Sequence, residues 1–172
     1  MLKKNSVLTT ARLIMHAYED CDMDAMTDIL LNEEIKKTFM IPDFESRSQA
    51  EELFYKLKRF SRSDDHFEYG IYLDGNLIGF INDCETDGDT IEVGYVISPE
   101  HNGNGYATEA LKAAIDELFR IGYNHITAGF FEENAASRRV MEKCGMHLLD
   151  MEDTEDYQGV THRCLYCVID KE

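Results

Sequence analysis

The chain has 172 residues, a length that suits one domain with its own hydrophobic core. Its formal net charge of −17 argues against nucleic acid as a partner, because two polyanions repel each other. No segment approaches the roughly 18 uninterrupted apolar residues of a membrane span. The two N-terminal lysines are not followed by the apolar stretch of a secretory signal, so we expect a cytoplasmic protein without a membrane partner.

The five cysteines do not indicate a disulfide framework or a metal site. Their number is odd and their positions are scattered along the chain. Cys164 and Cys167 lie three residues apart in a run that reads as a strand, where their side chains would point to opposite faces. No second Cys/His pair with zinc spacing accompanies them, so we expect no metal.

The N-terminal third is predicted to supply a first strand and two helices. Residues 7–16 read as one strand, and residues 22–32 read as a helix with methionine and aliphatic side chains on one side. Residues 36–44 read as an irregular linker that contains Pro42. Ser48 with Glu51 forms the pattern of a capping box, which predicts that the second helix begins there.

Three strands joined by tight turns are predicted next. Residues 66–73 and 77–82 flank the sequence Asp74-Gly75-Asn76, which is a hairpin signal. A turn at residues 87–89 then leads into a β-branched and aromatic run at residues 91–97. Consecutive antiparallel strands differ from the strict alternation of strands and helices in a doubly wound sheet.

The stretch from residue 91 to residue 118 reads as a strand, a glycine-bearing turn and a helix. Pro99 ends the strand, because proline has no N–H to continue a ladder, and Gly103 and Gly105 follow. Apolar side chains then recur at helical spacing, at Ala107, Ala110, Leu111, Ala114, Ile115 and Leu118.

A glycine-rich turn at a helix start is suited to binding a phosphate. The first N–H groups of a helix lack internal partners and lie at the positive end of its dipole, and glycine lets an anion approach them. The stretch is not a Walker loop, because no Gly-Lys-Ser/Thr sequence follows. Thr108 stands where a dinucleotide-binding fingerprint has its third glycine, which disfavours that alternative.

The C-terminal third is predicted to add one strand, a short helix and a closing pair of strands. Residues 125–131 read as the strand, and residues 134–145 read as a helix that a glycine ends. Residues 146–151 and 161–169 read as the closing strands. The acidic run at residues 150–156 is interpreted as the solvated tip between them.

The turn resembles motif A of the GNAT acetyltransferase superfamily, Gln/Arg-x-x-Gly-x-Gly/Ala, which falls here on residues 102–107 with Asn102 in place of Gln/Arg. The string at residues 105–110, GYATEA, is similar to the RimJ/RimL-type branch. Residues 9–14 resemble the opening strand of that branch, and residues 134–145 resemble its Asn-x-x-Ser helix. The resemblance implies a single-domain α/β GNAT fold over residues 1–172. Its mixed, mostly antiparallel central sheet would be flanked by helices and splayed at an acetyl-CoA site.

Acetyl-CoA is the co-substrate that this resemblance implies. The residues expected to bind it are Val96, Ile97, Asn102, Gly103, Asn104, Gly105, Tyr106, Ala107, Thr108, Asn134, Ser137 and Arg139. A basic cluster at Arg138, Arg139 and Lys143 would offset the negative charge of the chain toward an anionic cofactor.

Two residues are candidates for chemistry. By resemblance, Ser137 faces the CoA sulfur and stabilises or protonates the thiolate, and otherwise its hydroxyl bonds its own helix backbone. Glu92, on the strand before the turn, is the candidate general base, directly or through water. Glu68 and Asp83 on predicted neighbouring strands are rival bases.

The acceptor remains open at this stage. A primary amine, either a protein N-terminus or a small amine, would attack acetyl-CoA directly in a ternary complex, and the protein would be a monomer or a homodimer. The alternative is a non-catalytic acyl-CoA-binding or sensor domain of the same fold.

Overall fold

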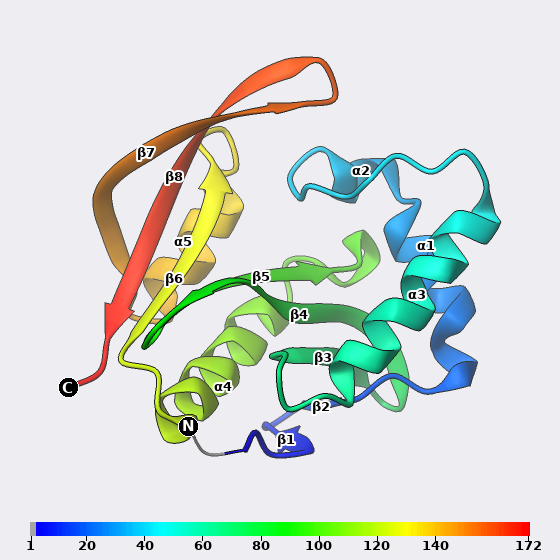
Figure 1. Cartoon of the computed structure of the whole chain (residues 1–172), viewed down its shortest axis with the longest axis horizontal. Helices are drawn as coiled ribbons and strands as arrows, with labels where there is room; N and C mark the ends of the chain where they lie inside the picture. The colour runs from blue at the N-terminus through cyan, green and yellow to red at the C-terminus, as the bar shows by residue number, and fades with distance from the viewer. Residues whose placement is uncertain (1–2) are drawn as a thin grey trace.

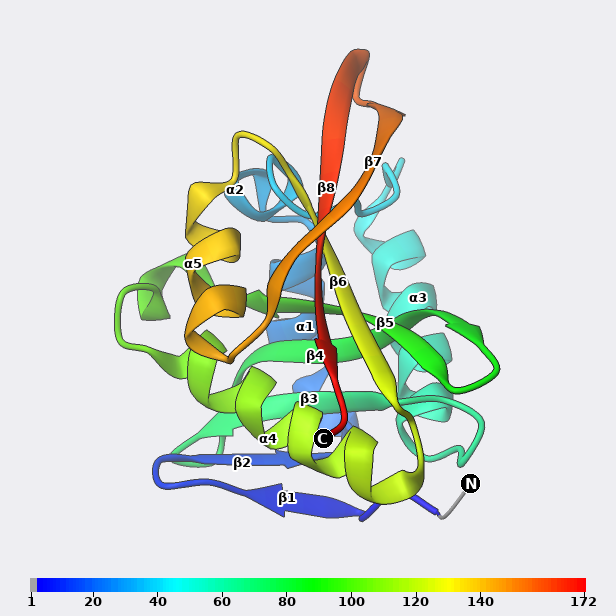
Figure 2. The same cartoon turned by 90° about the vertical axis from the view of Figure 1, so that its left-hand side faces the viewer.

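The computed structural model describes residues 3–172, and it contains one mixed sheet with helices on both faces (Figures 1 and 2). The sheet order is β1-β2-β3-β4-β5-β6-β8-β7. Among the strands of residues 3–172, only the β5–β6 pair is parallel, as expected for a mixed, mostly antiparallel sheet. No helix within residues 3–172 is long and apolar enough to cross a membrane.

The described N-terminal part, residues 3–61, contains two short strands and three helices. The strands are β1 (Val7–Thr9) and β2 (Leu13–His16). The helices are α1 (Met23–Leu30), which follows a 3-10 turn at Asp20–Asp22, α2 (Glu33–Lys36) and α3 (Arg47–Ser61). The rest of the chain forms β3 (Glu68–Leu73), β4 (Asn76–Asp87), β5 (Thr90–Ile97), α4 (Tyr106–Ile121), β6 (His125–Phe131), α5 (Ala135–Lys143), β7 (His147–Tyr157) and β8 (Val160–Asp170).

Two apolar cores lie on opposite faces of the sheet. Helix α4 packs its apolar stripe against one face, and this core includes Leu111, Leu118 and Ile126. Helices α1 and α3 pack against the other face around Phe54 and Phe80. The amphipathic patterns read from the sequence are therefore the surfaces that bury the two faces of the sheet.

The structure corrects four local interpretations of the sequence. Residues 7–16 form a hairpin rather than one strand, because Thr10 reverses the chain: its N–H donates to the Leu13 carbonyl at 2.9 Å and its hydroxyl accepts from the Leu13 N–H at 2.9 Å. Helix α3 begins after Ser46, so the expected capping box at Ser48 does not form. The short helix α2 lies just before and partly within the segment interpreted as an irregular linker.

The acidic run at residues 150–156 is the fourth correction. It belongs to strand β7, which pairs with β8 and carries most of these charges exposed. The tip of the hairpin is Gln158-Gly159, where both residues have positive φ. An edge strand tolerates such charge because one of its sides faces water, and charge also blocks pairing with other strands.

Two buried carboxylates in the fold have opposite surroundings. Glu117 on α4 is paired with Arg120 at 2.7 Å, and its pKa is lowered because hydrogen bonds to Arg120 and Asn5 outweigh the effect of burial. Glu68 on β3 is 2% exposed and accepts a hydrogen bond from the Tyr18 hydroxyl. Burial raises the pKa of Glu68 to about 8, although the hydrogen bond from Tyr18 acts in the opposite direction and lowers it.

We predict that the free energy of unfolding falls as the pH rises from about 5 to about 8, because folded Glu68 then holds a proton that the unfolded chain has lost. Glu68→Gln should remove this slope and be more stable than wild type at pH 9, by on the order of 2 kcal/mol. Urea unfolding at several pH values measures the free energy of unfolding of each protein. Glu117→Gln is the matched control and should lose stability at neutral pH, by an amount that shrinks as the pH falls. A wild-type stability that rises over this range would contradict the prediction.

Candidate functional site

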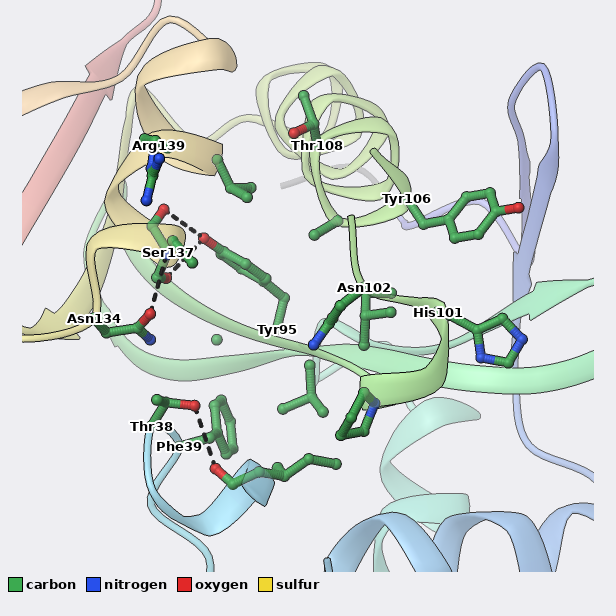
Figure 3. A pocket seen from close by; sticks show the side chains of 18 of the residues that line it. Thr38, Phe39, Tyr95, His101, Asn102, Tyr106, Thr108, Asn134, Ser137 and Arg139 are labelled. Atoms are coloured by element: carbon green, nitrogen blue, oxygen red, sulfur yellow. Dashed lines mark hydrogen bonds between the residues drawn. The ribbon is translucent and has the colours of Figure 1, made fainter. Parts of the chain in front are cut away.

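The site lies where the two parallel strands separate. Strands β5 and β6 pair only from Thr90–His125 to Glu92–Thr127. Beyond that point β5 continues alongside β4, and β6 continues alongside β8. The gap opens into a cavity of about 630 Å³, lined by the ends of both strands, the turn before α4, the start of α5 and part of α2 (Figure 3).

The glycine turn forms one wall of the cavity. Gly103 has φ +79° and Gly105 has φ +82°, conformations that favour glycine. A Cβ atom at Gly103 would meet nothing within 4 Å, so this backbone is open to a ligand. Gly105 is the N-cap residue of α4 and has no side chain to accept hydrogen bonds from the first N–H groups of the helix.

Arg12 holds this turn from the side of β2. Its guanidinium donates to the Asn104 carbonyl at 2.9 Å and to the Glu109 carboxylate at 2.7 Å. The same group lies 4.5 Å from the centre of the Tyr106 ring. Glu109 also accepts from the Arg12 backbone N–H at 2.7 Å, which ties the first turn of α4 to β2. Arg12 is not among the predicted site residues, although the motif at residues 9–14 includes it.

The start of α5 forms the facing wall. Asn134 caps this helix, because its side-chain oxygen accepts from the Ser137 N–H at 3.2 Å. Ser137 Oγ lies 2.9 Å from the Tyr95 hydroxyl, which reaches across from β5 (Figure 3). Arg139 and Lys143 also line the cavity, whereas Arg138 pairs with Glu142 and lines a separate groove.

The cavity brings together most of the residues expected to bind the cofactor. The lining set is Val96, Ile97, Asn102, Gly103, Gly105, Tyr106, Ala107, Thr108, Asn134, Ser137 and Arg139. Asn104 is not among them: its side chain donates to the carbonyls of His101 and Asn102, at 3.0 and 3.2 Å, and so stabilises the turn. Residues that the sequence did not single out form the far end, among them Thr38 and Phe39.

Glu92 lies beside the cavity, not in its lining. One carboxylate oxygen lies 3.1 Å from the position that a Cβ atom at Gly129 would occupy, next to the Tyr166 ring. Successive strand residues alternate faces, so Glu92 projects from the face opposite Tyr95. Burial, reinforced by the charge of Glu85, raises the pKa of Glu92.

The rival carboxylates have other partners. Glu68 is buried against Tyr18. Asp83 accepts from the Phe67 N–H at 2.8 Å and lies 3.1 Å from His66 Nδ1. No group of three or more His, Cys, Asp or Glu side chains in the described part of the chain is arranged to hold a metal ion.

Comparison with known proteins identifies the family to which the chain belongs. Residues 12–147 match the acetyltransferase (GNAT) domain family. The chain belongs to the GNAT acetyltransferase family. It is therefore an acetyl-CoA-dependent acetyltransferase. The uncharacterized N-acetyltransferase YoaA of Bacillus subtilis is 29% identical over 144 residues, which cover 81% of each protein.

Solved structures share the architecture of this acetyltransferase. A GNAT-family acetyltransferase from Bacillus anthracis superposes with a TM-score of 0.82 at 23% identity, over 95% of this chain and 98% of that one. RimL, a ribosomal L7/L12 α-N-protein acetyltransferase in complex with coenzyme A, superposes with a TM-score of 0.84 at 14% identity, over 95% and 97% of the two chains. The expected GNAT fold is confirmed, and it is similar to the fold of RimL.

We predict that Arg12→Ala weakens acetyl-CoA binding about five- to tenfold, close to 1–1.4 kcal/mol, because the turn loses its anchor. Titration calorimetry measures the dissociation constant. Arg47→Ala is the matched control: Arg47 is 45% exposed against 46% for Arg12, and it makes ion pairs with Asp24 and Asp28 that do not involve the turn. Equal affinities for the two variants would show that Arg12 does not support the site.

Proposed function

We propose that the protein, as one acetyltransferase domain over residues 1–172, moves an acetyl group from acetyl-CoA to a primary amine by direct attack in a ternary complex. The observation that carries the proposal is the separation of β5 and β6 in front of a positive-φ glycine turn that opens onto the start of α4. The acetyl carrier would enter this gap, and the amine would reach it from the other face of the sheet.

The chemistry of the lining fits the cofactor. The backbone N–H groups at residues 103–108 would hold the pyrophosphate of acetyl-CoA, since glycine leaves them uncovered and the dipole of α4 favours an anion. Arg139 and Lys143 add positive charge to the cavity of a chain whose net charge is −17. The unpaired edge of β5 at Val96 and Ile97 offers backbone groups to the amide-bearing arm of the cofactor.

Glu92 is proposed to take the proton of the acceptor. An aliphatic ammonium has a pKa of about 10, so it must lose a proton before its nitrogen attacks. Burial raises the pKa of Glu92 toward that of the amine, which makes the carboxylate a stronger base than an exposed one. Its position next to Gly129, on the face opposite Tyr95, suits an amine that arrives from that face, directly or through one water.

The acceptor is proposed to be a cationic primary amine, either a protein N-terminus or a small amine. The net charge of −17 attracts cations over a distance. Several structural neighbours carry ribosomal-protein acetyltransferase names, which supports a protein N-terminus among the candidates. A panel of amines assayed by thiol release would identify it, and no release above the uncatalysed background with any amine would support the non-catalytic alternative.

We predict that Gly103→Ala raises the dissociation constant of acetyl-CoA at least tenfold, near 1.4 kcal/mol, because its methyl group occupies the open backbone of the turn. Gly75→Ala is the matched control: Gly75 has φ +81° against +79° for Gly103, and a Cβ atom meets nothing within 4 Å at either residue. Both variants should lose similar stability, but only Gly103→Ala should lose affinity in calorimetry. Unchanged affinity in a folded Gly103→Ala protein would rule out phosphate binding at this turn.

We predict that Glu92→Gln lowers turnover about 100-fold or more at limiting acceptor, the usual scale of general-base catalysis, with acetyl-CoA affinity retained. The wild-type rate should rise with pH through one ionisation, since only the carboxylate accepts a proton. Glu85→Gln is the control: it removes the neighbouring charge, should keep the maximal rate and should move that ionisation to lower pH. A Glu92→Gln protein with an unchanged rate and a lower melting temperature would assign Glu92 a structural role.

A further inference from the structure

Tyr95 and Ser137 make two contacts across the cavity. The Tyr95 hydroxyl lies 3.1 Å from the Ser137 backbone oxygen and 2.9 Å from Ser137 Oγ. Both side chains line the cavity (Figure 3). The Tyr95 ring also packs against the core under α4. Packing therefore fixes the Tyr95 ring, and the hydroxyls of Tyr95 and Ser137 face the space proposed for the acyl carrier.

The two contacts allow two arrangements of the same heavy atoms. A backbone oxygen only accepts, so one arrangement has Tyr95 donating to it and Ser137 donating to the phenol oxygen. In the other, Tyr95 donates to Ser137 Oγ, and the serine proton points elsewhere. The Ser137 carbonyl keeps a helical partner in α5 in either case, so the exchange of arrangements leaves no buried group unsatisfied.

We propose that Tyr95 is a positioning residue for the leaving group: it donates to Ser137 Oγ and thereby directs the serine O–H toward the departing CoA thiolate. This inference rests on the proposed function, in which Ser137 faces the sulfur. Without the Tyr95 hydroxyl, Ser137 in the first turn of α5 would donate its O–H to a backbone carbonyl one turn back. That O–H would then no longer point into the cavity.

Neither the Tyr95 hydroxyl nor the Ser137 hydroxyl gives up its proton during acetyl transfer. The neutral amine nitrogen bonds to the acetyl carbon, the C–S bond breaks with its electron pair staying on sulfur, and the nitrogen releases one proton to water as the amide forms. The Ser137 O–H hydrogen-bonds that sulfur, and the thiolate later takes a proton from water. Tyr95 remains a neutral donor throughout, because burial raises its pKa well above the usual range, far from the value of about 8.5 for an alkyl thiol.

The test measures the pKa of the CoA thiol when CoA is bound, from the ultraviolet absorbance of its thiolate. Difference spectra against the complex with desulfo-CoA cancel the five protein cysteines, including Cys144 and Cys167, whose thiol pKa values burial raises. No acceptor is needed. In wild type we expect the bound thiol pKa to lie about one unit below that of free CoA, the size of one charge-assisted hydrogen bond.

Variants separate the roles of the two hydroxyls. Ser137→Ala should return the bound thiol to the value of free CoA, and Tyr95→Phe should raise it by at least about half a unit. The double variant should match Ser137→Ala alone, because Tyr95 acts through Ser137. Tyr69→Phe is the matched control: it removes another core hydroxyl that donates to a backbone carbonyl, that of Asn5, and should leave the thiol pKa unchanged.

The outcomes distinguish the role of Tyr95, the role of Ser137 and the proposed cofactor site from one another. A thiol pKa in Tyr95→Phe equal to wild type, with Ser137→Ala raised, overturns the role of Tyr95 and keeps that of Ser137. A wild-type value equal to free CoA overturns the leaving-group role of Ser137 and, with it, this inference. Absence of CoA binding overturns the proposed site itself. Melting temperature and desulfo-CoA affinity verify folding, and Tyr95→Met replaces Tyr95→Phe if the latter does not fold.

Discussion

The separation of β5 from β6 after three paired residues is the constraint on which the rest of the site depends. Parallel strands normally continue side by side, since each backbone N–H and C=O needs a partner. Here β5 stays with β4 and β6 stays with β8, so both strands keep one paired neighbour while their facing edges part. The open edge of β5 exposes polar backbone groups inside a cavity, and a ligand with amide groups can satisfy them.

The gap also divides the chemistry between two faces of the sheet. Tyr95 and Ser137 lie on the side of α4 and α5, where the glycine turn opens. Glu92 projects from the opposite face, next to Gly129, where the absence of a side chain leaves room for its carboxylate. In the proposed mechanism, Ser137 therefore contacts the leaving thiolate on one face of the sheet, and Glu92 accepts the proton of the incoming amine on the other.

The local parts of this arrangement could be predicted from the sequence. The strand, glycine turn and helix at residues 91–118 appear in the structure as β5, the turn and α4, because β-branching, proline, glycine and helical periodicity each act within a few residues. The hairpin at Asp74-Gly75 formed for the same reason, since both residues have positive φ. The resemblance to known family motifs extended these local patterns to the whole fold.

Contacts between distant residues could not be predicted in this way. Arg12 and Glu109 are 97 residues apart, and Tyr95 and Ser137 are 42 apart, so only the assembled sheet brings them together. Residues 150–156 read as a loop from their charge, yet they lie in strand β7 and residues 152–156 pair with β8, because an edge strand can carry charges toward water. Tyr95 itself reads as an ordinary strand residue until the position of α5 is known.

The central claim is that the main chain of residues 103–108 holds the phosphates of acetyl-CoA. Backbone amide chemical shifts of nitrogen-15-labelled protein, recorded during an acetyl-CoA titration, test it most directly. The account predicts that the largest shifts fall on the amides of residues 103–108, with further shifts at Asn134 and Ser137. Saturable shifts confined to the separate groove that Arg138 lines together with Leu148, Glu152 and Arg163, with the turn unaffected, would contradict it.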